Sequence, residues 1–263
     1  MTKIYYFSGT GNSLWSARKI AETIGGECVP VNIGGELHRD EIIVEADAVV
    51  LVFPSYAFGL PLAVKRFAER AVFKTPYLAA FVTAGSSPGG TLAALARILK
   101  RKNIAALCFG RIPAVENYIA IFGAPKEKTE RRRLEMQRQA TREAARCVME
   151  QRVNRVNTFR PVSAFVWLLF SLGVKIFYRQ YRVSDDCDGC GICERVCPVS
   201  AVSMRGEEGK IRPVFSAKCE HCQGCLNWCP KKAIHFGRLN SRVARYHHPE
   251  ISLKDASYET RRS

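Results

Sequence analysis

The sequence predicts an α/β protein: a doubly wound, five-stranded parallel sheet, then a helical connector, then a small α+β domain. Three observations favour this fold class. Apolar runs alternate with helix-patterned segments over the first 120 residues, as at residues 48–53 and 78–82. A charged stretch without Gly or Pro follows at residues 126–157. A cysteine run then occurs twice, as CDGCGICERVCP from residue 187 and as CEHCQGCLNWCP 32 positions later.

The composition is that of a folded, basic protein. The chain has 263 residues, 47% of them hydrophobic, which is enough to bury a core. Residues 121–182 hold 14 basic and 5 acidic side chains, whereas residues 1–120 hold 13 and 9. The N-terminus leads directly into a strand pattern, with no basic segment before a long apolar run. We therefore expect no signal peptide and a reducing, cytoplasmic setting.

Five strands are expected, near residues 3–7, 28–31, 48–53, 78–82 and 104–109. Loops rich in small residues follow three of them, at residues 8–13, 54–61 and 83–90. Ligands bind at the carboxyl ends of the strands in doubly wound sheets. These three loops are therefore the candidate ligand site.

The first loop, SGTGNS, lies between a strand and a helix pattern. Free backbone N–H groups at a helix N-terminus, together with Ser and Thr hydroxyls, make an anion site. The loop has no Lys, so it is not a Walker A motif, and it is not G-x-G-x-x-G. An ordinary turn that caps a helix is the alternative.

The loop resembles the phosphate loop of flavodoxins, [ST]-x-T-G-x-[ST], and this resemblance implies bound FMN. Tyr56 and Phe58 are then candidates to stack on the flavin ring, with plain loop packing as the alternative. Residues 85–90 would face the ring's polar edge, and neither later loop carries an acidic residue. The candidate FMN-binding residues are Ser8, Gly9, Thr10, Gly11, Asn12, Ser13, Ser55, Tyr56, Phe58, Gly59, Thr83, Gly85, Ser86 and Gly89.

Each cysteine run has the spacing C-x2-C-x2-C-x3-C-P, which is typical of bacterial iron–sulfur ferredoxins. Zinc sites usually place their CxxC pairs further apart, and disulfides need an oxidising compartment, so we expect two [4Fe–4S] clusters. Resemblance to two-cluster ferredoxins implies that the fourth cysteine of each run crosses to the other cluster. One cluster would take Cys187, Cys190, Cys193 and Cys229, and the other Cys219, Cys222, Cys225 and Cys197. The remaining Cys28, Cys108 and Cys147 are expected to be small buried apolar residues rather than a disulfide framework.

Residues 126–157 are expected to form one long amphipathic helix. Its polar face would carry Arg131, Arg132, Arg133, Arg138, Arg142 and Arg146. This face is either simply solvated or a docking surface for an acidic protein or an anionic membrane. No base-reading motif accompanies the charge, which argues against nucleic acid.

The next stretch, residues 161–174, is apolar and uncharged, but shorter than the roughly 20 residues that span a bilayer. We expect a helix packed between the two redox domains. An interfacial membrane helix is the alternative.

The tail after Phe236 is basic and irregular, and we expect it to pack back on the body. Its pair His247 and His248 has no third metal ligand nearby in sequence. Near the cysteine runs, His221 and His235 either tune a cluster through hydrogen bonds or lie exposed and inert.

The whole layout resembles a family of flavodoxin–ferredoxin fusion proteins, on the phosphate loop, the TAGSSPGG loop, residues 112–119 and the doubled cysteine run. The resemblance implies a flavodoxin-like FMN domain (1–122), a basic helical connector (123–182), a two-cluster ferredoxin-like domain (183–237) and a basic tail (238–263). It also implies electron transfer between FMN and two [4Fe–4S] clusters, towards a redox partner protein. Exposed clusters would favour an anaerobic setting.

An electron carrier without catalytic residues is the first hypothesis, because no nucleophile or acid–base dyad stands out in the flavin loops. A flavin-dependent oxidoreductase that reduces a small molecule is the second. The third is an FMN-free docking domain fused to a ferredoxin.

Overall fold

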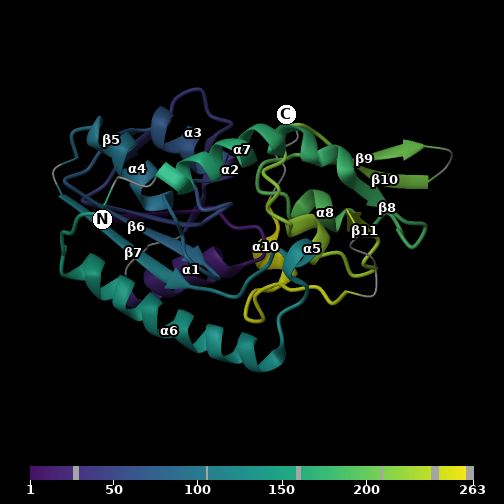
Figure 1. Cartoon of the computed structure of the whole chain (residues 1–263). Coiled ribbons are helices and arrows are strands. Elements are labelled where there is room, and N and C mark those ends of the chain that lie inside the picture. Colours follow the sequence, from purple (N-terminus) through teal and green to yellow (C-terminus); the bar gives the residue numbers. More distant parts are fainter. Residues whose placement is uncertain (26–29, 105, 158–160, 208–209, 238–242, 259–263) are drawn as a thin grey trace.

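A computed structural model describes residues 1–25, 30–104, 106–157, 161–207, 210–237 and 243–258. The chain forms two lobes that contact each other (Figure 1). The sheet lobe is built from residues before 158, and the cysteine lobe contains both cysteine runs.

The sheet lobe contains a parallel sheet of β1 (Thr2–Tyr6), β2 (Val31–Asn32), β4 (Ala48–Pro54), β6 (Tyr77–Ala84) and β7 (Ala106–Pro113). Its order is β2-β1-β4-β6-β7. Counted along this five-stranded sheet, that is 2-1-3-4-5, the doubly wound order of flavodoxin. The predicted fold class is confirmed. The second strand begins at Val31, and residues 28–29 of the predicted strand lie outside the described residues.

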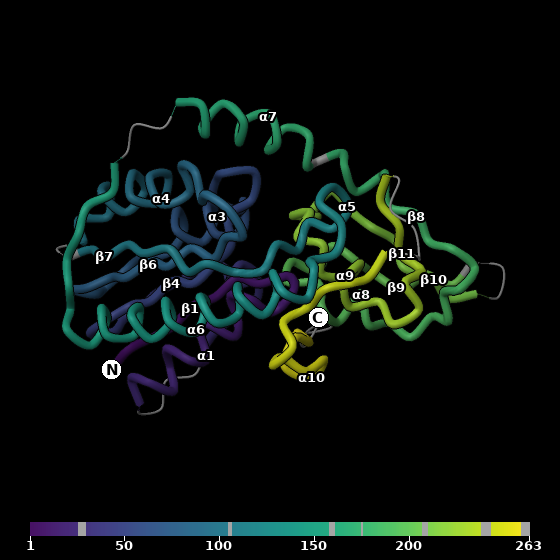
Figure 2. Tube along the Cα trace, turned by 60° about the horizontal axis from the view of Figure 1, so that its bottom comes forward, coloured from purple at the N-terminus to yellow at the C-terminus, as the bar shows by residue number. Residues whose placement is uncertain are grey.

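Helices cover both faces of the sheet (Figure 2). One face carries α1 (Asn12–Ile24) and α6 (Glu127–Met149), and the other carries α3 (Leu62–Arg70) and α4 (Thr91–Lys100). Helix α2 (Ile33–Glu36) packs in the same core cluster as α3. Ile4 and Val50 pack on the first side, whereas Tyr5 and Leu51 pack on the second. The central strands are continuously apolar because both of their faces are buried. A separate parallel pair joins β3 (Ile43–Glu45) to β5 (Val72–Lys74).

The basic helix α6 is shorter than predicted, because it ends at Met149 rather than near residue 157. Gln151 has a φ of +47°, which breaks the helical path. Asn154 then donates its backbone N–H to the Leu107 carbonyl at 3.0 Å. Val153 is therefore 62% exposed rather than part of an apolar stripe.

Cys108 on β7 and Cys147 on α6 are joined by a disulfide, so the prediction of two separate small apolar residues was wrong. Both cysteines come from elements that pack face to face, which sequence spacing alone could not show. Cys28 lies outside the described residues.

The cysteine lobe has two antiparallel pairs, β8 (Tyr181–Val183) with β11 (Ile234–Phe236) and β9 (Val202–Glu207) with β10 (Lys210–Phe215). Two short helices, α8 (Ile192–Arg195) and α9 (Gly224–Asn227), each contain the third cysteine of a run, Cys193 and Cys225 respectively. The remaining short elements are α5 (Ile119–Phe122), η1 (Tyr178–Gln180) and α10 (Leu253–Ala256).

Helix α7 (Pro161–Phe177) leads from one lobe to the other along the outside of the molecule (Figure 2). The prediction that it packs between the two lobes was wrong, since Val162 is 76% exposed and Leu172 is 63% exposed. Trp167 anchors the helix by donating its indole N–H to the Leu60 carbonyl at 2.8 Å. Within the described residues, no helix is both long and apolar enough to cross a bilayer.

Candidate functional site

A cavity of about 410 Å³ lies at the carboxyl ends of β1, β4 and β6. It is lined by most of the predicted flavin-site residues, namely Ser8, Gly9, Thr10, Asn12, Ser13, Ser55, Tyr56, Phe58, Thr83, Gly85 and Ser86. Three loops that are far apart in sequence therefore meet at one edge of the sheet, as the doubly wound order requires.

Three predicted residues, Gly11, Gly59 and Gly89, do not line the cavity. Gly11 caps α1 with a φ of +95°, a conformation that only glycine adopts at no steric cost. Gly59 packs under Trp167, and a Cβ on Gly89 would lie 2.4 Å from the Phe58 Cβ. These glycines shape the loops rather than face a ligand.

The loop of residues 8–13, which the sequence predicts to bind phosphate, is fixed by hydrogen bonds around the start of α1. The Gly11 N–H donates to the Ser8 hydroxyl at 3.1 Å, and the Ser13 and Thr83 hydroxyls lie 2.8 Å apart. The amides of Asn12 and Ser13 have no hydrogen-bond partner in the described part of the chain. Two free amides at the N-terminus of a 13-residue helix suit a phosphate group.

Tyr56 lines the cavity, but its hydroxyl is buried behind the cavity wall. Its ring packs edge-on against Phe7, with ring centroids 6.3 Å apart. Its hydroxyl is buried without a hydrogen-bond partner among the described residues, and burial raises the pKa of Tyr56 well above its usual value. A buried unpaired hydroxyl costs about 1–3 kcal/mol. Cys222 and Glu220 are near enough to act on this hydroxyl, so it lies on the side of the cysteine lobe, closed off from the open cavity.

Sequence reasoning missed two site residues in the loop after β7. Asn117 donates its side-chain amide to the Thr10 hydroxyl oxygen at 2.8 Å, which leaves the Thr10 proton free for an anion. Glu116 lies beside Gly85, since a Cβ there would be 2.8 Å from a Glu116 carboxylate oxygen. The sequence shows no acidic residue in the loops at residues 54–61 and 83–90. In the structure, the loop after β7 adds the carboxylate of Glu116 to the cavity lining.

The cysteine lobe forms the other wall of this cavity, through His221, Cys222 and Gln223. A Cβ on Gly9 would lie 2.5 Å from the Cys222 carbonyl oxygen. Trp228 donates its indole N–H to the Gly9 carbonyl at 3.2 Å. The phosphate loop and the second cysteine run are therefore in van der Waals contact.

His221 is buried, so the exposed and inert alternative does not apply to it. Its two ring nitrogens lie 2.7 Å from the Tyr118 hydroxyl and 3.1 Å from the Tyr181 hydroxyl. Burial lowers the pKa of His221 to about 4. These contacts fix the loop that lies between the cavity and Cys219, whose sulfur accepts the His221 backbone N–H at 3.3 Å.

The eight cysteines gather in two groups that mix the two runs. A small cavity of about 20 Å³ is lined by Cys187, Cys190, Cys193 and Cys229. Burial raises the pKa of Cys193 to about 12, with smaller contributions from the charges of Cys229 and Cys190. Burial also raises the pKa of Cys222, and there the contributing neighbours are Cys197 and Cys219.

This donor set fits a four-iron cube. The described residues include no three His, Cys, Asp or Glu side chains close enough to share one metal ion. Cube ligands each bind a different iron and need not converge on one point. Backbone N–H groups that donate to cysteine sulfurs are also typical of such sites, and the Ala201 N–H donates to the Cys197 sulfur at 3.1 Å.

The tail braces the phosphate loop from behind, which confirms that it packs on the body. The His248 N–H donates to the Thr10 carbonyl at 2.8 Å, and the Tyr258 hydroxyl donates to the Ser8 carbonyl at 2.8 Å. His248 stacks on Trp15 with ring centroids 4.9 Å apart.

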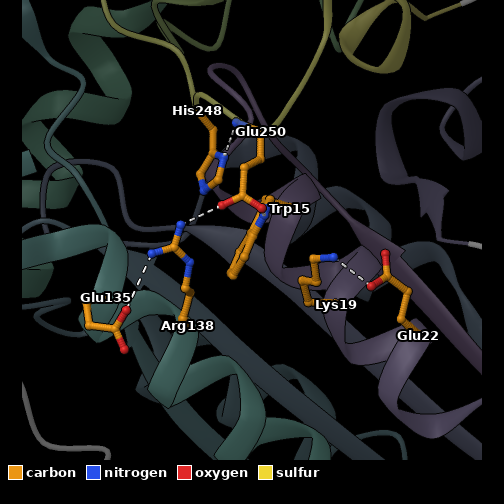
Figure 3. Close-up of polar contacts among 7 residues, drawn as sticks. All are labelled: Trp15, Lys19, Glu22, Glu135, Arg138, His248 and Glu250. Carbon is orange, nitrogen blue, oxygen red and sulfur yellow. Dashed lines mark hydrogen bonds and ion pairs between the residues drawn. The ribbon is translucent and has the colours of Figure 1, made fainter. Parts of the chain in front are cut away.

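An ion pair ties the tail to the basic helix as well (Figure 3). Glu250 accepts from the Trp15 indole at 3.0 Å and from Arg138 at 2.9 Å. One arginine of the predicted basic face is thus engaged inside the molecule. His247 stacks on Trp228 with ring centroids 4.0 Å apart, so the histidine pair serves packing here.

Comparisons with known proteins identify the cysteine lobe. The family model of the 4Fe–4S dicluster domain matches residues 186–242. A ferredoxin-like protein in the nif region of Sinorhizobium fredii is 35% identical over 54 residues, which cover 18% of this chain and 80% of that protein. Ferredoxin-1 of Chlorobaculum tepidum is 33% identical over 58 residues, covering 20% of this chain and 89% of that protein.

Solved structures resemble the sheet lobe only distantly. An azoreductase from Bacillus anthracis has a TM-score of 0.38 at 10% identity, covering 57% of this chain and all of that one. An NAD(P)H:quinone oxidoreductase from Methanothermobacter marburgensis has a TM-score of 0.37 at 9% identity, covering 59% and 98%. The assignment of the fold rests on the strand order of the sheet instead.

Proposed function

Through its cysteine lobe the chain belongs to the 4Fe–4S dicluster ferredoxins, and from that premise we propose that it transfers electrons between FMN and two [4Fe–4S] clusters. One observation carries the proposal: the flavin-type loops and the second cysteine run are walls of a single cavity. A cofactor in this cavity would lie against Cys222, with no protein layer between them.

In this proposal each cluster is bound by cysteines from both runs. One cluster takes Cys187, Cys190, Cys193 and Cys229, and the other takes Cys219, Cys222, Cys225 and Cys197. The second cluster is then the one next to the cavity. The first lies beyond it and is the natural exit towards a partner, because Cys190 is exposed.

FMN would bind with its phosphate at the start of α1. The free amides of Asn12 and Ser13 and the Thr10 hydroxyl would hold the phosphate. Tyr56 and Phe58 would flank the ring, and the loop around Gly85 would face its polar edge.

The cofactors supply one-electron chemistry, and the residues of the chain supply position and a dry environment. Phe170 and Phe177 close one side of the cavity and the loop 221–223 closes another. The cavity is open to solvent beside Phe58, Ile121 and Phe122, which are 42–69% exposed. We favour a carrier because one wall of the cavity is the cysteine lobe itself. The carrier would serve a redox partner protein, acidic in keeping with the chain's net charge of +16. The Cys108–Cys147 disulfide does not fit the reducing cytoplasm expected from the sequence, so the proposal names no compartment.

Cofactor content of anaerobically purified protein tests the proposal. We expect about one FMN with about eight iron and eight sulfide per chain, as two four-iron cubes require. Thr10→Ile should lose FMN and keep its iron, because it removes a phosphate donor and fills the loop. Thr23→Ile, on the exposed side of α1, is the matched control and should keep both. Eight iron without FMN, even after incubation with FMN, would instead support the docking-domain hypothesis.

A further inference from the structure

Helix α7 exposes a continuous apolar face. Six large side chains on it are 49–76% exposed, namely Val162, Phe165, Leu168, Leu169, Leu172 and Ile176. Most of them recur at spacings of three and four, so they share one side of the helix. An exposed apolar patch of this size on a folded protein marks an interaction surface.

The inner side of the same helix already holds it in place. Trp167 is bonded to the Leu60 carbonyl, and Val174 is 1% exposed. Phe170 and Phe177 line the cofactor cavity. The outer face is therefore not needed to anchor the helix.

The chain around α7 carries positive charge without any negative charge. Residues 151–184 contain six Lys or Arg and no Asp or Glu. Arg155, Arg179 and Arg182 are exposed, and among the described residues none of them has a carboxylate partner.

Three arginines of α6 differ in this respect, whereas Arg132, Arg133 and Arg142 have no ion pair among the described residues. Arg131 pairs with Glu127, Arg138 with Glu135 and Glu250, and Arg146 with Glu143. Helix α6 also lies on the opposite side of the sheet lobe from α7 (Figure 2). On the α7 side of the molecule, the positive charges available to a partner are therefore those of the arginines next to α7.

We propose that α7 is an interfacial helix that docks this protein on an anionic membrane surface. At 17 residues it is about 26 Å long and would lie flat, with its apolar side chains among the acyl chains and the arginines at the lipid headgroups. Docking would hold the cavity wall formed by Phe170 and Phe177 about one helix diameter, roughly 10 Å, from the bilayer.

A lipid surface fits this face better than a protein does. Protein interfaces carry about one hydrogen bond per 100–200 Å², which requires polar groups on the face. The outer face of α7 offers almost none, and Ser171 donates its hydroxyl to the Leu168 carbonyl of its own helix at 2.8 Å.

Vesicle flotation of the full, cofactor-loaded chain tests this proposal. We expect binding to vesicles of phosphatidylcholine with 30% phosphatidylglycerol, and weaker binding as salt rises or when only phosphatidylcholine is present. Phe165→Ser with Leu172→Ser should lower the partition coefficient at least ten-fold, because two large apolar side chains leave the interface.

The matched control is Ile43→Ser with Val72→Ser. These side chains are 46% and 47% exposed and pair across β3 and β5, so the change removes two exposed apolar side chains outside α7. The control should bind within two-fold of the unaltered chain. Arg179→Gln with Arg182→Gln should weaken binding to the anionic vesicles several-fold and leave the phosphatidylcholine baseline unchanged.

Two results would overturn the proposal. One is equal binding of the unaltered chain to anionic and neutral vesicles, or to neither. The other is unchanged vesicle binding by the α7 variant with normal FMN and iron content. Loss of self-association in that variant, without any vesicle binding by the unaltered chain, would assign the face to a second copy of the chain instead.

Discussion

Gly9→Ala tests the contact between the phosphate loop and the second cysteine run. Gly9 has an ordinary backbone conformation, so alanine adds only one methyl group. That methyl would lie 2.5 Å from the Cys222 carbonyl oxygen and 2.9 Å from its Cβ. Both are parts of a buried loop that cannot swing away, so the two loops must separate by several tenths of an ångström.

Inserting a methyl group into a packed site costs about 1–3 kcal/mol. For a chain of this size a loss of 1 kcal/mol lowers the midpoint of thermal unfolding by roughly 2–4 °C. We therefore expect the midpoint of Gly9→Ala, scanned anaerobically at a fixed rate, to fall by about 2–12 °C. Gly35→Ala is the control, because nothing lies within 4 Å of the added Cβ.

The same substitution should slow electron exchange between flavin and clusters, since it widens the contact between the Gly9 loop and the second cysteine run. FMN and iron content should remain those of the unaltered chain. An unchanged unfolding midpoint together with an unchanged exchange rate would refute the contact on which the proposed function depends.

Two further substitutions probe the site and its brace. Glu116→Gln removes a negative charge beside Gly85, so the reduced flavin should become easier to form. We expect the flavin reduction potentials, measured by spectroelectrochemical titration, to rise by roughly 40–90 mV per electron. Unchanged potentials would place Glu116 away from the ring. Burial lowers the pKa of His248 from 6.5 to about 4. The free energy of unfolding should therefore fall as the pH is lowered from about 6.5 towards 4, with a loss of about 1.4 kcal/mol at pH 5.5. His248→Phe keeps a ring over Trp15 and should flatten this dependence of the unfolding midpoint on pH, whereas an equally steep dependence would assign it to other groups.

The sheet and its loops were predictable because their signals are local. Continuous apolar runs mark buried parallel strands, and small residues after them mark the loops that face a ligand. The loop residues Ser8, Thr10 and Tyr56 were found in this way, and all three line the cavity.

The missed features depend on contacts between segments that are distant in sequence. Glu116 and Asn117 follow the last strand in a stretch without glycine-rich character, and only the closure of the sheet edge brings Asn117 to Thr10 and Glu116 to Gly85. The sequence of the tail predicts no regular structure, yet the backbone N–H of His248 donates a hydrogen bond to the Thr10 carbonyl in the first loop. The apolar run of α7 predicted burial, whereas the structure leaves one of its faces uncovered.

The central claim is that electrons pass between FMN and the clusters within one chain. Flash photoreduction of the flavin, followed at flavin and cluster wavelengths over a series of protein concentrations, tests it most directly. The account predicts that the clusters are reduced as the flavin is reoxidised, at a rate that does not depend on protein concentration. A rate that rises in proportion to protein concentration, or clusters that stay oxidised beside reduced flavin, would contradict it.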